Sequence, residues 1–285
     1  HEQAASEPDF AHIRPPYGFL HQGNQDEAEF AANAASWLDD KINEIGASNV
    51  AAFVAEPIQG AGGVIVPPAG YFKHIQEICR RHDILFVADE VITGFGRTGQ
   101  WFASQTMELE PDMMALAKGL TSGYVPMSAV MVGDRVANKL IADGGEFYHG
   151  FTYSGHPVAA AVALANLELI EREDMITRVR EDTGPYLAEA LVPLAEHRIV
   201  GEIRTFGVLA AIELVKSKDG PEMFEDTGAT GVICRDHAIN RGLMMRAVRD
   251  AMILSPALTY SRADIDETVR IAAQALDATA DQLGL

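Results

Sequence analysis

Short apolar runs alternate with a helical segment along the first half of the chain. The runs are nearly continuous, as strands buried on both faces are, and they lie at residues 50–56, 84–88, 113–117 and 127–132. Between the first two runs, apolar side chains recur at the spacing of one helix face: Phe72, Ile75, Ile78 and Cys79. This order predicts an α/β domain with a mainly parallel sheet.

The second half mixes helices and strands without a clear repeat. Helical pattern runs from Pro157 to about Ala195 and is interrupted at Gly184-Pro185. A strand, a helix, an apolar run and a final helix are then predicted at residues 208–215, 228–241, 251–254 and from 262 onward. We therefore expect a large domain over residues 1–170 and a small α+β domain over 171–285, joined by the long helix. The first forty residues look polar and irregular.

Ionisable residues follow three of the predicted strands. Glu56 ends the first, Asp89 the second and Lys118 the third. Ligands of open α/β sheets bind beyond the carboxyl ends of the strands, so parallel neighbours would bring these three groups to one edge. A lone buried charge costs several kcal/mol and needs a partner or a ligand. A structural salt bridge between Asp89 and Lys118 is the plain alternative.

The apolar surroundings of Lys118 favour chemistry over that salt bridge. Five residues without a polar side chain precede it, so we expect burial to lower its pKa from about 10.4. A neutral amine attacks carbonyl groups. A lysine that forms a Schiff base and an aspartate that pairs with a pyridinium nitrogen are the two groups that pyridoxal 5'-phosphate requires. The freed amine can then move a proton as general base and acid.

A competing interpretation takes Gly94-Phe-Gly96-Arg-Thr-Gly99 as the G-x-G-x-x-G turn of a dinucleotide-binding domain. That turn binds pyrophosphate at a helix N-terminus directly after a strand. Here Asp89 and Glu90 precede the glycines and would repel phosphate, and the following residues make a poor helix. The glycines are therefore expected to form only a turn.

Composition narrows the classes of partner. The formal net charge of −19 argues against nucleic acid, and no apolar stretch is long enough to span a membrane. The N-terminus lacks the pattern of a signal peptide, and the two distant cysteines suggest a reducing cytoplasm. The histidines show no metal-ligand spacing, and no G-x-S-x-G motif is present.

Four motifs together resemble the class III aminotransferases, and within them the ω-amino acid:pyruvate transaminases. They are VAEPIQGAGGVIVPP (54–68), FVADEVITGFGRTG (86–99), ALAKGLTSGY (115–124) and HGFTYSGHP (149–157). The likeness implies a fold-type I enzyme that is a homodimer with shared active sites. It would bind pyridoxal 5'-phosphate and move an amino group from an ω-amino acid or amine to pyruvate or a similar keto acid.

The resemblance also assigns roles to single residues. Lys118 resembles the Schiff-base lysine, Asp89 the partner of the pyridine nitrogen, and Val91 a residue that packs on the ring. Thr152 resembles the threonine that reaches the phosphate of the partner's cofactor, and Phe151 would wall the partner's substrate pocket. Glu56 resembles a glutamate that lines the site.

Arg246 matches a mobile arginine that admits a substrate carboxylate, which a guanidinium can hold with two hydrogen bonds. The ornithine and γ-aminobutyrate branches carry an arginine where this chain has Ile253, and glutamine where it has Ile92, which favours the pyruvate-using branch. Relatives have a further stretch before His1, which supplies the loop that holds the cofactor phosphate. A decarboxylase or aminomutase of the same fold, or an inactive fragment, remains the alternative.

Overall fold

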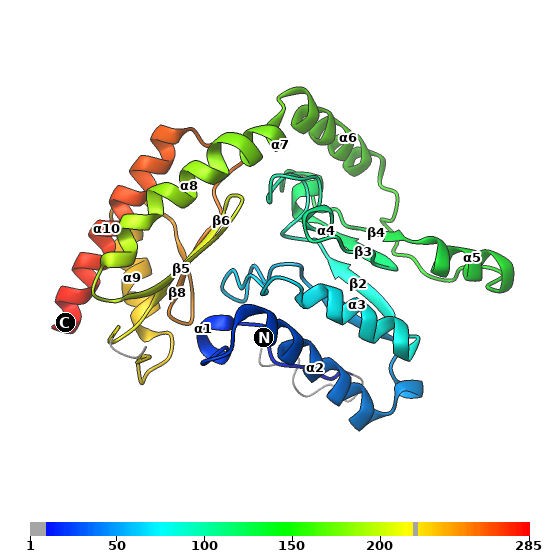
Figure 1. The fold of residues 1–285 in the computed structure, drawn as a ribbon. Helices are drawn as coiled ribbons and strands as arrows, with labels where there is room; N and C mark the ends of the chain where they lie inside the picture. The colour runs from blue at the N-terminus through cyan, green and yellow to red at the C-terminus, as the bar shows by residue number, and fades with distance from the viewer. Residues whose placement is uncertain (1–9, 219–221) are drawn as a thin grey trace.

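A computed structural model describes residues 10–218 and 222–285 and contains two four-stranded sheets (Figure 1). The first sheet has the order β1-β2-β3-β4, in which β1, β2 and β3 are parallel and β4 is antiparallel to β3. The strands span Ala52–Ala55, Leu85–Asp89, Met113–Leu116 and Ala129–Val132. All four lie within the predicted runs or one residue beyond them, and the predicted mainly parallel sheet is confirmed.

Helices α2 (Glu27–Ile45) and α3 (Tyr71–His82) pack together and cover one face of this sheet (Figure 1). The prediction that the first forty residues are irregular is wrong from residue 27 onward, because α2 begins there. Asp26 caps α2 by accepting a hydrogen bond from the Glu29 N–H at 2.8 Å. Half of the buried residues of α2 are alanines, which weakens the helical pattern in the sequence.

The expectation that the strands are buried on both faces is wrong. Val54 on β1 is 60% exposed, and Val130 on β4 is 61% exposed. The register places both side chains on the face opposite to Phe53 and Phe86, so among the described residues this face lacks the cover that α2 and α3 give to the other. Beyond β4, the chain forms α5 (Asp134–Asp143).

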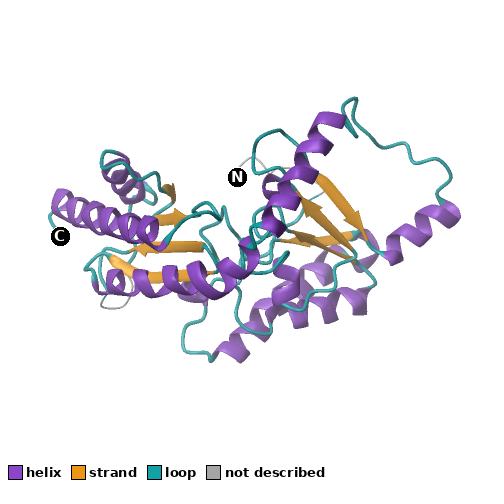
Figure 2. Ribbon diagram, turned by 90° about the horizontal axis from the view of Figure 1, so that it is seen from above, coloured by secondary structure: helices purple, strands orange, loops and turns teal. Residues whose placement is uncertain are grey.

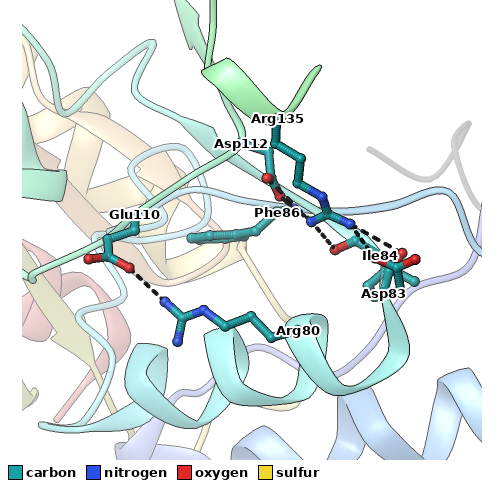
Figure 3. Close-up of polar contacts among 7 residues, drawn as sticks. All are labelled: Arg80, Asp83, Ile84, Phe86, Glu110, Asp112 and Arg135. Atoms are coloured by element: carbon teal, nitrogen blue, oxygen red, sulfur yellow. Dashed lines mark hydrogen bonds and ion pairs between the residues drawn. The ribbon is translucent and has the colours of Figure 1, made fainter. Parts of the chain in front are cut away.

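Polar contacts hold the end of α3 against the starts of β2 and β3 (Figure 3). The Arg135 guanidinium contacts the carboxylate of Asp83 at 2.6 Å and that of Asp112 at 3.2 Å. The Asp112 carboxylate also accepts a hydrogen bond from the Phe86 N–H at 2.8 Å. These contacts tie the segments that enter the two strands, so they support the register in which both strands end at the same edge.

The second sheet is antiparallel, with the order β5-β6-β8-β7. The bounds are Val200–Phe206 (β5), Leu209–Leu214 (β6), Arg246–Val248 (β7) and Ala251–Leu254 (β8). Helices α8 (Gly184–Leu191), α9 (Ala229–Ile239) and α10 (Arg262–Leu283) pack on one face and close an apolar core (Figure 1). The helices predicted at 228–241 and from 262 are confirmed, whereas β5 was not predicted.

Between the two sheets runs a series of helices, as Figure 2 shows. Helix α6 (Pro157–Arg172) leads through α7 (Met175–Arg178) and a π-helical turn (Val179–Thr183) into α8. The π-turn immediately precedes Gly184-Pro185, where the missing N–H of Pro185 prevents a regular α-helix. The interruption predicted at this dipeptide is therefore a local widening of the helix. The domain boundary near residue 170 stays a prediction.

The remaining helices are one turn long: α1 (Gly18–His21) and α4 (Ala103–Thr106). Both cysteines, Cys79 and Cys234, are free and buried. Within the part of the chain that the structure describes, no helix combines the length and the apolar character needed to cross a membrane.

Arg204 on β5 joins three parts of the chain in a buried cluster. Its guanidinium contacts the Glu213 carboxylate at 2.7 Å and also donates to the Tyr17 hydroxyl. It further donates to the backbone carbonyls of Gly63 at 2.7 Å and Val64 at 3.2 Å. The N-terminal segment, the 60–64 loop and the second sheet therefore share one buried cation.

We expect Arg204→Met to lower the free energy of unfolding by about 3–5 kcal/mol, because it leaves the buried Glu213 carboxylate without its cation. The matched control is Arg198→Met, which breaks the exposed ion pair with Asp281 and should lower it by less than about 1 kcal/mol. Urea unfolding followed by circular dichroism measures both. Equal losses in the two variants would contradict the assigned role of Arg204.

Candidate active site

The structure brings Glu56, Asp89 and Lys118 together at one edge of the first sheet. Glu56 directly follows β1, Asp89 is the last residue of β2, and Lys118 lies two residues after β3. Asp89 is paired in register with Ala115 of β3. Burial raises the pKa of Glu56, the neighbouring Asp89 raises it further, and the charge of Lys118 acts in the opposite direction. Asp89 and Lys118 therefore both lie within electrostatic reach of Glu56.

Lys118 lies on the wall of a cavity of about 890 Å³. It begins a 3-10 turn, Lys118–Leu120, with a left-handed φ of +42°. The residue is exposed, so the expectation that it is buried among apolar side chains is wrong. Nor does Lys118 form an ion pair with Asp89 or with any other described residue, so the plain salt-bridge alternative is not what the structure contains.

Backbone N–H groups orient the two carboxylates. Asp89 accepts a hydrogen bond from the Val91 N–H at 3.0 Å, and Glu56 accepts one from the Gly60 N–H at 2.9 Å. Residue 60 lies so close to Ile92 that a Cβ atom there would be 2.7 Å from the Ile92 side chain, and a glycine avoids this contact. The cavity wall includes Val91, Ile92 and Gly60. The loops that orient the two carboxylates therefore also form part of this wall.

Arg246 and Ile253 line the far side of the same cavity. Arg246 is the exposed first residue of β7, and it pairs in register with Ile253 on β8. The two positions at which the sequence departs from the ornithine and γ-aminobutyrate branches, Ile92 and Ile253, therefore both face this cavity. Its wall is apolar at these positions and carries a cation at Arg246.

Several polar residues of the cavity wall were missed in the sequence, among them Arg97 and Asn166. Arg97 donates a hydrogen bond to the Pro256 carbonyl, and burial lowers its pKa to about 10. Asn166 lies on α6 and contacts the turn after Lys118. Arg97 lies within the glycine motif, which was interpreted only as a turn. Asn166 stood out only as a polar residue within the apolar helix that begins at Pro157.

The glycine motif forms turns, as predicted, and no long helix follows it. Residues 91–100 are turns and bends, and α4 after them has four residues. Glu90 is fully buried, and its carboxylate accepts hydrogen bonds from the N–H groups of Ala103 at 3.0 Å and Ser104 at 2.6 Å. The start of α4, where a phosphate would have to bind in the dinucleotide interpretation, is therefore occupied by a carboxylate of the chain itself.

Thr152 and Phe151 lie away from this cavity. Both are exposed, in the loop that arches from α5 to α6 in Figure 2, and neither belongs to the cavity wall of its own chain. Phe151 is 78% exposed, and its N–H donates to the Ser154 hydroxyl at 2.9 Å. Of the seven residues predicted for the site, the chain thus brings together five and leaves these two outside.

The architecture is that of the fold-type I transaminases, as comparison with solved structures shows. A thermostable ω-transaminase variant from Pseudomonas jessenii superposes with a TM-score of 0.93 at 40% identity, covering 98% of this chain and 62% of the other. The ω-transaminase of that organism in complex with PMP superposes with a TM-score of 0.92 at 41% identity, with the same coverage. The predicted fold class is confirmed.

The chain belongs to the class-III aminotransferase family, whose family model matches residues 1–276. A putrescine–pyruvate aminotransferase of Pseudomonas aeruginosa is 53% identical over 96% of this chain and 59% of its own length. A vanillin aminotransferase of Capsicum annuum is 40% identical over 93% of this chain and 58% of its own. The chain thus spans about three fifths of the relatives' length. The predicted family is confirmed, and so is its cofactor class, because class-III aminotransferases depend on pyridoxal 5'-phosphate.

The residues at the cavity fit the ring end of this cofactor. Lys118 and Val91 line the cavity, where they would supply an amine for the aldehyde and an apolar side chain for the ring face. Asp89, which accepts a hydrogen bond from the Val91 N–H, would supply a carboxylate for the ring nitrogen. Among the described residues, the Asp89 carboxylate accepts one hydrogen bond and forms no ion pair, so it keeps acceptor capacity for a ligand.

The raised pKa of Glu56 has a measurable consequence for stability. A carboxyl whose folded pKa lies above its ordinary 4.5 stabilises the fold below that value, and the contribution is lost as pH rises through the folded pKa. Glu56→Gln keeps an acceptor for the Gly60 N–H but cannot ionise. We expect the free energy of unfolding of Glu56→Gln to increase relative to that of the parent protein as pH rises above 4.5. Urea unfolding at a series of pH values measures both. An advantage that is constant with pH, or larger in acid, would contradict this assignment.

Proposed function

We propose that the full-length protein is a transaminase that moves an amino group from an amine or ω-amino acid to pyruvate or a similar keto acid. One observation carries the proposal: Asp89 ends β2, Lys118 follows the neighbouring parallel strand β3 at the same edge of the sheet, and Lys118 lines a large cavity there. The name of the Pseudomonas aeruginosa relative, which pairs putrescine with pyruvate, supports the choice of substrates.

In this proposal the residues have distinct roles. Lys118 would hold the cofactor, and its freed amine would remove the proton from the amine-bearing carbon of the substrate as general base and give it back as general acid. Asp89 keeps the ring nitrogen protonated, and Val91 packs on the ring. Glu56 borders the site beside them. The cofactor, when bound, supplies an electron sink for the substrate carbon that loses its proton. Because Lys118 is exposed to the cavity, its amine can reach a ligand without a rearrangement of the sheet.

Arg246 is the proposed contact for a substrate carboxylate. It stands exposed on the cavity wall, and among the described residues it forms no ion pair. A free guanidinium can hold a carboxylate with two parallel hydrogen bonds, whereas the apolar Ile92 and Ile253 suit an uncharged part of an amine. The cavity can therefore accept both the keto acid and an amine with an apolar body.

We also propose a homodimer with shared sites, in the cytoplasm. Four aromatic side chains of the loop between α5 and α6 are between 68% and 87% exposed, a density that suits an interface: Phe147, Tyr148, Phe151 and Tyr153. Thr152 lies among them and would reach the phosphate of the partner's cofactor, while Phe151 would wall its substrate pocket. The two free thiols suit a reducing compartment.

Transamination should depend on Lys118. Full-length protein supplied with pyridoxal phosphate, an amine donor and pyruvate should form alanine, and Lys118→Ala should lower the rate at least about a thousandfold because no other amine takes its place. The exposed Lys73 on α3 provides the control, since Lys73→Ala should keep the parent rate. Normal turnover in the Lys118 variant would refute the mechanism, and carbon dioxide release in place of alanine would point to a decarboxylase.

A mixed dimer tests the shared site. Lys118→Ala removes the amine, and Thr152→Asp places a carboxylate where the partner's phosphate would lie, so each variant alone should be inactive. Co-expression should restore about a quarter of the parent activity, because half of the dimers are mixed and each has one intact site of two. No recovery in a purified mixed dimer would contradict the sharing while leaving the Lys118 result unaffected.

A further inference from the structure

Asn166 is a buried amide on an otherwise apolar helix face. Asn166 is only 8% exposed, and the other buried residues of α6 are Ala163 and Ile170. Both of these belong to an apolar cluster with Phe95 and Leu120. A buried side-chain amide must find hydrogen-bond partners, and an apolar residue of similar size would fill the space without that demand. The partners of Asn166 therefore indicate why an amide stands at this position.

All of those partners belong to the turn that begins at Lys118. The Asn166 Nδ2 donates to the carbonyl oxygens of Gly119 at 2.8 Å and Leu120 at 3.1 Å. Its Oδ1 accepts a hydrogen bond from the Ser122 hydroxyl at 2.7 Å. Both amide hydrogens and the amide oxygen are thus used on a single segment of five residues.

The turn needs such support because its backbone is unfavourable. Lys118 and Ser122 have left-handed φ angles of +42° and +49°, which L-residues with a side chain adopt only when their surroundings hold them. On its other side the turn lies against Phe95, where a Cβ atom on Gly119 would come within 2.9 Å. The segment after Lys118 is therefore held between Phe95 and Asn166.

We propose that Asn166 is a positioning residue for Lys118: it fixes the turn and so sets the direction in which the Lys118 amine enters the cavity. The inference rests on the proposed function and adds a residue outside the four sequence motifs. Asn166 itself gains and loses no proton and forms no covalent bond. A residue that only stabilised the fold would alter unfolding without changing how Lys118 reacts in the folded protein.

The test measures the reactivity of Lys118 directly. Pyridoxal phosphate is added to the cofactor-free, full-length protein, the adduct is reduced with borohydride at timed intervals, and peptides are mapped. The exposed Lys73 serves as an internal reference. Asn166→Leu should slow labelling of Lys118 about ten- to a hundredfold relative to Lys73, as expected when hydrogen bonds that orient a reacting group are lost. In steady-state assays kcat should fall while KM for the amine stays the same.

Graded variants separate the individual hydrogen bonds. Asn166→Asp keeps an acceptor for Ser122 but loses both donors. Labelling of Lys118 should therefore be as slow in this variant as in Asn166→Leu. Ser122→Ala, at an exposed position, removes one bond of three and should be slowed less. The control is Asn33→Leu on the exposed face of α2, which should label at the parent rate.

Parent-like labelling of Lys118 in folded Asn166→Leu would overturn the inference. If Asn166→Leu does not fold, parent-like labelling of Lys118 in Asn166→Asp overturns the inference. If neither variant folds, an unchanged labelling rate in Ser122→Ala overturns it. Failure of the parent protein itself to label at Lys118 would instead refute the proposed function, so the two failures are distinguishable.

Discussion

The parallel pairing of β1, β2 and β3 is the constraint on which the site depends. Strands that run in the same direction end at the same edge, so the residues that follow them meet whatever their separation in sequence. Asp89 lies 33 positions after Glu56, and Lys118 lies 29 positions after Asp89. Both nevertheless interact electrostatically with Glu56. The contacts of Arg135 with Asp83 and Asp112 support the same alignment from the opposite ends of the strands (Figure 3).

A second constraint comes from the Arg204 cluster, which connects this edge to the second sheet. Arg204 binds the carbonyls of Gly63 and Val64, and the same loop carries Gly60, whose N–H orients the Glu56 carboxylate. Val64 also packs against Leu209 and Ala211 of β6. The cavity wall on the side of Glu56 is therefore fixed by a cation that does not itself line the cavity.

Much of the fold and part of the site could be predicted from the sequence. The short apolar runs identified the parallel strands because their side chains are nearly all apolar, and the chemistry of Asp89 and Lys118 led to the cofactor class. Helix α2 was not predicted because half of its buried residues are alanines, and β5 was not predicted because Arg204 and Glu202 interrupt its apolar pattern.

The local surroundings of the site were harder to predict. The exposure of Lys118 depends on a left-handed turn that its apolar neighbours do not indicate. The contacts of Asn166 join residues 44 to 47 positions apart, which no local pattern contains. The roles of Thr152 and Phe151 came from family resemblance alone, since both lie on a loop outside the wall of the cavity that Lys118 lines.

The burial of the two cysteines has a practical consequence. Burial raises the pKa of the Cys79 thiol to about 12 and that of Cys234 to about 11, so at neutral pH both stay protonated and shielded from maleimides. A cysteine introduced on the loop between α5 and α6 would then be the principal reactive thiol among these residues. Spin labels or fluorophores could be attached there without first removing the native sulfur atoms, and distances between labelled copies could be measured in solution.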